Sequence, residues 1–85
     1  MNELLKFPCA WEVKAFGPST EQFELEVVQI VRRHVPDLSE TAVTTRASRS
    51  GKYLAVSVAI RARSRAQLKA IYAELKAHPA VLMTL

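Results

Sequence analysis

The feature that most limits the fold is a strict alternation of residues near the middle of the chain. Branched apolar residues occupy every second position from 54 to 60. Since a β-strand directs successive side chains to opposite faces, this pattern predicts a strand with one buried face. The predicted buried face consists of Leu54, Val56, Val58, Ile60 and Ala62. The opposite face, left toward solvent or a partner, consists of Tyr53, Ala55, Ser57 and Ala59.

The first half of the chain predicts a strand followed by a helix. Residues 11–16 form the expected strand, because the pair Gly17-Pro18 after them favours a turn. Ser19 and Gln22 have the spacing of a capping box, and they should begin a helix that ends before Pro36. The stripe expected along this helix is Phe23, Val27, Ile30, Val31 and His34.

The remaining elements flank the alternating strand. Residues 41–48, rich in Thr and Val, predict a second strand that reaches the alternating one through a tight turn at Ser50-Gly51. Such a turn requires a positive φ, which we expect at Gly51. Ser64 with Gln67 predicts the cap of a second helix that ends by Pro79. A final strand is predicted from the alternation of Val81, Met83 and Leu85.

The predicted order is β-α-β-β-α-β, which is an α+β, ferredoxin-like arrangement over a single domain, residues 1–85. Two helices should pack on one face of a four-stranded antiparallel sheet. Right-handed crossovers would place strands one and three in the middle and strands two and four at the edges. The expected core is Val27, Ile30, Val31, Leu54, Val56, Val58, Ile60, Leu68, Ile71, Leu75 and Val81.

Short motifs in a fixed order span nearly the whole chain: NELLKFPC at 2–9, SRSGKY at 48–53, VSV at 56–58, IYAEL at 71–75 and VLMTL at 81–85. Together they resemble the YbeD-like family of small bacterial proteins. The resemblance implies a fold similar to ACT-type regulatory domains, which bind small molecules or pair with copies of themselves. A link to lipoate metabolism has been suggested for this family, and the resemblance implies the same link here. The family has no established catalytic residue, so the resemblance implies none in this chain. ACT-type ligand sites often use a glycine at the end of the first strand, where Gly17 stands.

Cysteine use and hydropathy indicate the compartment. The chain has one cysteine and therefore cannot form an intrachain disulfide, and no leader of signal type opens the sequence. No apolar run approaches the ~20 residues of a membrane helix. We therefore expect a cytoplasmic protein with no membrane contact.

Charge is distributed unevenly along the chain. Residues 1–45 carry four basic and seven acidic side chains, whereas residues 46–85 carry eight basic and one acidic. The basic half could present a surface for nucleic acid or another acidic ligand, or it could be solvated strand ends and helix faces. The candidate basic patch is Arg46, Arg49, Lys52, Arg61, Arg63 and Arg65.

The residues that could carry chemistry are few and scattered. Cys9 has no cation or helix N-terminus beside it in the sequence and is expected to be a semi-buried structural thiol. His34 and His78 lie where the two helices should end, and the helix dipole would favour a protonated imidazole at that position. The spacing of these residues predicts no metal site, and two isolated glycines make no phosphate loop. We expect no cofactor and no enzymatic activity.

Binding is the remaining class of function. The first hypothesis is a module that contacts a protein partner, or a second copy of itself, through the open sheet face, with a small ligand also possible. The second is weak RNA binding by the basic half. RNA-binding domains of this strand order stack bases on aromatic rings of the two central strands. Strand three has one such ring, Tyr53. Because one ring makes a poor stacking platform, RNA binding is the second hypothesis and is not excluded.

Overall fold

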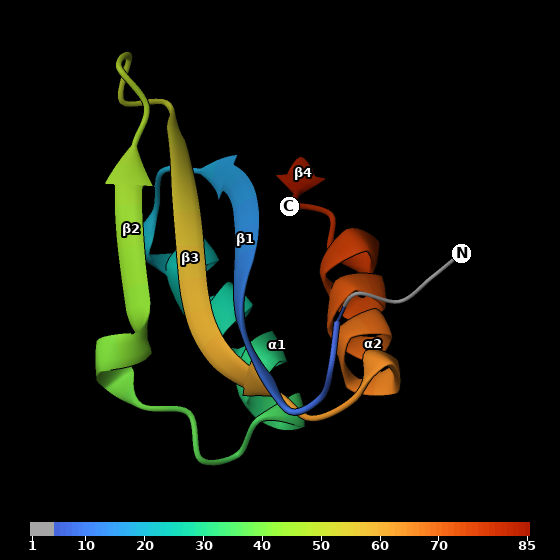
Figure 1. The fold of residues 1–85 in the computed structure, drawn as a ribbon. Coiled ribbons are helices and arrows are strands. Elements are labelled where there is room, and N and C mark those ends of the chain that lie inside the picture. Colours follow the sequence, from blue (N-terminus) through green and yellow to red (C-terminus); the bar gives the residue numbers. More distant parts are fainter. Residues whose placement is uncertain (1–4) are drawn as a thin grey trace.

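The computed structural model describes residues 5–85, which form one four-stranded sheet and two α-helices (Figure 1). The first residues of the NELLKFPC motif, 2–4, lie outside this part of the chain. The strands are β1 (Cys9–Pro18), β2 (Val43–Ala47), β3 (Tyr53–Ala62) and β4 (Met83–Thr84). The helices are α1 (Glu21–His34) and α2 (Arg65–Ala77), with a short 3-10 helix at Glu40–Ala42.

The sheet order is β2-β3-β1-β4, and all neighbouring strands are antiparallel. The prediction that strands one and three are central is therefore confirmed, as is the ferredoxin-like α+β class. Both helices lie on one face of the sheet, and no described helix covers the other (Figure 1). This second face is called the open face below.

Helix caps follow local side-chain chemistry. Ser64 caps α2 as expected, since its hydroxyl accepts a hydrogen bond from the Gln67 N–H. The predicted cap of α1 is wrong by one residue: Thr20 Oγ1, not Ser19, accepts from the Phe23 N–H at 3.0 Å. Ser19 and Thr20 both carry a hydroxyl group that can cap a helix. Because β1 continues to Pro18, the helix begins one residue later than predicted and Thr20 becomes the cap.

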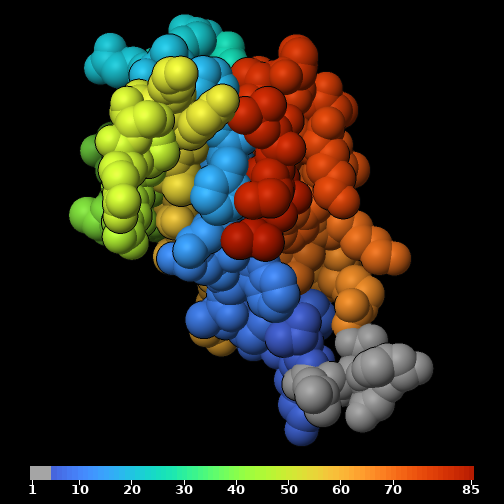
Figure 2. Space-filling model, turned by 90° about the horizontal axis from the view of Figure 1, so that it is seen from above, coloured from blue at the N-terminus to red at the C-terminus, as the bar shows by residue number. Residues whose placement is uncertain are grey.

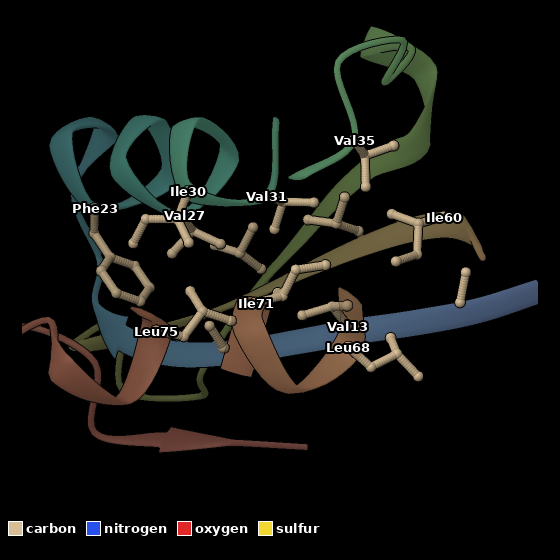
Figure 3. Close-up of a cluster of buried hydrophobic side chains, with 14 residues drawn as sticks. Val13, Phe23, Val27, Ile30, Val31, Val35, Ile60, Leu68, Ile71 and Leu75 are labelled. Carbon is tan, nitrogen blue, oxygen red and sulfur yellow. The ribbon is translucent and has the colours of Figure 1, made fainter. Parts of the chain in front are cut away.

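The core lies between the helices and the sheet (Figure 3). Nine of the eleven predicted core residues are buried, whereas Leu54 and Val81 are only partly buried. Leu54 lies near the hairpin end of β3, and Val81 belongs to the turn before β4, where its N–H donates to the His78 carbonyl. The core also contains Phe23 and Ala62, which the predicted helix stripe and strand face already included. It further contains three residues that no predicted face included: Val13, Ala15 and Val35.

Three strands differ from their predicted bounds, which were 11–16, 41–48 and 81–85. β1 runs from Cys9 to Pro18, so the predicted turn at Gly17-Pro18 is wrong: both residues belong to the strand. The Ser19 N–H still donates to the Lys52 carbonyl. β2 starts at Val43, because Ser39 caps the 3-10 turn and accepts from the Thr41 N–H. β4 has two residues only, since the chain turns through residues 78–81 before it reaches the sheet. None of the helices within residues 5–85 is long and apolar enough to cross a membrane.

Candidate functional site

The predicted interaction residues of β3 do lie on the open face. They alternate with Val56, Val58 and Ile60, which are buried against the helices. Tyr53 is 50% exposed and Ala59 is exposed, whereas Ala55 and Ser57 are half-buried in the middle of the sheet. The small side chains make the centre of this face shallow enough for close approach by another molecule.

A second aromatic ring lies on the same face, and sequence reasoning missed it. Phe16 of β1 is paired directly with Ala55 of β3, and Ala55 is two residues from Tyr53. Residues in this diagonal relation are about 7–8 Å apart between Cα atoms, within reach of aromatic side chains. The signal that could have found Phe16 is the alternation of β1, whose inward positions Val13 and Ala15 are fully buried.

The two rings border one hollow beneath the β2–β3 hairpin. Its volume is about 460 Å³, and Ala55 lies between the rings. Figure 2 shows the end of β1 set between the hairpin in yellow and the C-terminal segment in red. The lining residues are Phe16, Arg46, Ala47, Ser48, Arg49, Tyr53, Leu54 and Ala55.

Apolar side chains continue this surface toward β4. Met83 is paired with Phe16, and Leu85 exchanges two backbone hydrogen bonds with Lys14, at 3.1 and 2.9 Å. Met83 and Leu85 are 53% and 63% exposed, respectively. Exposed large apolar residues grouped in this way are typical of an interaction surface.

The six residues of the candidate basic patch do not lie in one place. Arg46 and Arg49 line the hollow below the hairpin, whose turn also carries Lys52. Arg61 and Arg63 line another hollow, of about 430 Å³, at the opposite end of β3. Arg65 begins α2 and borders a third, beside Trp11 and Tyr72.

The cations on the open face are largely unneutralised. Among residues 5–85, Arg46, Arg49 and Arg61 take part in no ion pair. Glu12 is the carboxylate that the strand register places on this face, and it lies 3.8 Å from Lys14 Nζ. The open face therefore combines two rings with an excess of positive charge.

The other sequence candidates take structural positions. Cys9 is half-buried and packs against the core, as predicted. His34 Nε2 lies 2.7 Å from Glu74 Oε1, and His78 Nε2 lies 2.8 Å from Glu26 Oε1. Both histidines thus join the two helices to each other. Within residues 5–85, no three His, Cys, Asp or Glu side chains lie close enough together to hold a metal ion.

His78 makes a second contact that fixes its tautomer. Its Nδ1 accepts a hydrogen bond from the Ala80 N–H at 3.1 Å. The ring proton must then be on Nε2, where it can be donated to Glu26. The ring thus contacts both partners and holds the turn that leads into β4.

Glu74 is the centre of the other interhelical contact. It accepts hydrogen bonds from the Arg33 guanidinium and also meets His34. Hydrogen bonding to Arg33, and then to His34, lowers the pKa of Glu74 below its usual value. This cluster faces away from the open face, because it joins α1 to α2.

Gly17, which the family resemblance suggested as part of a ligand site, has a packing role. It is buried, and a Cβ atom at this position would lie 2.4 Å from the Phe23 ring and 2.7 Å from the Ala80 carbonyl oxygen. A side chain has no room there. The glycine therefore allows β1 to pass beneath α1 and the turn before β4.

Comparison with known proteins gives full-length matches. The sequence model of a family described as "Protein of unknown function (DUF493)" matches residues 2–85. A UPF0250 protein of Chromobacterium violaceum is 41% identical over 99% of this chain and 94% of its own length. A UPF0250 protein of Nitrosomonas europaea is 39% identical, over 99% and 97%. One from Paraburkholderia phytofirmans is 38% identical, over 100% and 97%. The family resemblance predicted from the sequence is confirmed.

Proposed function

We infer the function of this chain, which belongs to the DUF493/UPF0250 family of small bacterial proteins, from the surface that its fold exposes. We propose that it is a non-enzymatic binding module that acts through the open face of its sheet. One observation carries this proposal: the helices cover one face, while the other exposes Tyr53, Met83 and Leu85.

The contents of this face support binding better than catalysis. Ala55 has no reactive group, and both histidines lie between the helices, away from the Ser57 hydroxyl. The charged side chains nearby are guanidinium groups and a Lys–Glu pair. Arginine recognises anionic groups through fixed hydrogen-bond donors. It stays protonated near neutral pH, so it is poorly suited to acid–base catalysis. A regulatory role in the cytoplasm, an ACT-like mode of ligand binding and the link to lipoate metabolism stay predictions from the sequence and the family resemblance.

The test places a charge at the centre of the open face. Ser57 is flanked by Lys14 and Thr44 on the neighbouring strands, so Ser57→Glu adds bulk there without entering the core. The matched control is Gln29→Glu, which adds the same group at an exposed position of α1. Thermal melts of both variants should resemble the parent.

Association is then measured in two ways. Sedimentation velocity reports self-association, and affinity capture from a bacterial lysate, with and without ribonuclease, reports partners. We expect the parent and Gln29→Glu to self-associate or to capture a partner, and we expect Ser57→Glu to do neither. If all three proteins behave alike in both assays, the open face is not the binding surface.

A further inference from the structure

The hollow below the hairpin combines features that a single-stranded nucleic acid would use together. Phe16 and Tyr53 come from the two central strands, and both line the same hollow. RNA-recognition motifs have this strand order, and they bind single-stranded RNA by stacking unpaired bases on rings at these two strands. The sequence-based ranking placed RNA second because it counted one ring, and the structure supplies the other.

The space around the rings suits flat groups. Ala55 lies directly across from Phe16, and Ser57 follows on the same face of β3. Neither side chain would hinder a base from lying flat on the sheet.

The charged groups around the rings are arginines, whose positive charge would attract the phosphates of a nucleic acid. Arg46 and Arg49 line the hollow, and Arg61 lies on the same face at the far end of β3. Within the part of the chain described, none of these three arginines is paired with a carboxylate. Cations along the path of a backbone, with rings between them, are the usual composition of a single-strand binding surface.

We propose that the ligand of the open face is a segment of single-stranded RNA, with bases stacked on Phe16 and Tyr53 and phosphates contacting Arg46 and Arg49. This inference rests on the proposed function, because it names the ligand of the same surface. RNA is the expected nucleic acid, because recognition of RNA mostly targets unpaired loops, bulges and ends.

The first experiment measures binding of the full chain to a fluorescently labelled, mixed-sequence RNA of about ten nucleotides. Tyr53→Ala should weaken binding roughly 5- to 150-fold, the loss expected for one stacked base. Leu25→Ala is the control, because Leu25 is exposed to a similar extent, 57% against 50% for Tyr53, but lies on α1. It should bind as the parent does, and melting curves should show both variants folded.

The second experiment tests the phosphate contacts by varying salt between about 50 and 200 mM. Arg49→Gln should reduce the slope of log affinity against log salt by about 0.7, the value for one phosphate of a single strand. Lys69→Gln removes the same charge from the exposed side of α2 and should leave the slope unchanged. Equal effects of the two variants would show attraction by net charge and would overturn the proposal.

The remaining outcomes separate this inference from the proposed function. Absence of RNA binding at low salt, equal binding to an RNA duplex, or preference for a free nucleotide would each overturn the RNA assignment. If Ser57→Glu still loses a ribonuclease-resistant partner in those cases, the open face remains a binding surface for another ligand. If Ser57→Glu changes nothing either, both proposals fail.

Discussion

Gly17 and the Phe23 ring occupy adjoining space so closely that a Cβ atom on Gly17 would lie 2.4 Å from the ring. The neighbouring Ala80 carbonyl oxygen, 2.7 Å away, belongs to the backbone and cannot rotate aside. We therefore expect Gly17→Ala to destabilise the protein by about 1–3 kcal/mol through overpacking. Chemical denaturation checks this value, and an unchanged midpoint would show that the turn before β4 can shift.

Gly51 should respond to substitution for a different reason. Its φ is +80°, as predicted from the hairpin, and no atom lies within 4 Å of a Cβ placed there. The cost is therefore conformational and not steric. Gly51→Val should destabilise by about 1–3 kcal/mol, and Gly51→Asn by less, because Asn tolerates positive φ. Thermal melts compare the two, and equal melting temperatures would contradict this account.

The alternation of residue types predicted the open face of β3 correctly, because branched apolar residues lie on one face and mostly small residues on the other. The same alternation runs through β1, with Glu12 and Lys14 on the open side, but the prediction did not use it to place Phe16. Trp11 lies on the helix-covered side and Phe16 on the open side. Periodicity indicates which face of a strand a ring takes, but it does not indicate whether a ring on the open face serves binding.

Contacts between distant segments were also beyond sequence reasoning. Trp11 and Tyr72 are 61 residues apart, and Arg33 and Glu74 are 41 apart. Their pairing depends on how α2 lies against β1 and α1, which no local pattern encodes. The cap of α2, by contrast, was predictable because Ser64 and Gln67 belong to one turn.

Ile71 tests the core. It is fully buried between α2 and the sheet, whereas Leu25 on α1 is largely exposed. Ile71→Ala should cost about 2–5 kcal/mol, because it removes buried methyl groups and leaves a cavity. Leu25→Ala should stay within about 0.5 kcal/mol of the parent. Urea denaturation measures both, and similar values for the two variants would mean that the helix facing is wrong.

Tyr72 joins three segments through one hydroxyl. Trp11 Nε1 donates to it at 2.9 Å, and the hydroxyl donates to the Leu85 main-chain oxygen at 2.7 Å. Tyr72→Phe leaves both partners without this bond and should cost about 1 kcal/mol, with a change in tryptophan fluorescence. Tyr53→Phe is the control, since the Tyr53 hydroxyl makes no hydrogen bond within residues 5–85. An unchanged Tyr72→Phe variant would show that water replaces the hydroxyl.

Glu74 makes stability depend on pH in a defined direction. Its pKa is lowered in the folded protein by Arg33 and then by His34, so the folded state favours the charged carboxylate. The resulting stabilisation is complete above the unfolded pKa, near 4.5, and is lost as the pH falls through the lower folded pKa.

The corresponding variant is Glu74→Gln, which keeps the size of the side chain and removes its charge. The difference in unfolding free energy between the parent and Glu74→Gln should be greatest at neutral pH and should shrink as the pH is lowered below about 4.5. Asp37→Asn is the control, because Asp37 is exposed and forms no ion pair in the described part of the chain. Its difference from the parent should vary little over the same range. Denaturation series at several pH values provide the comparison, and a constant difference for Glu74→Gln would show that the Arg33 contact does not persist in solution.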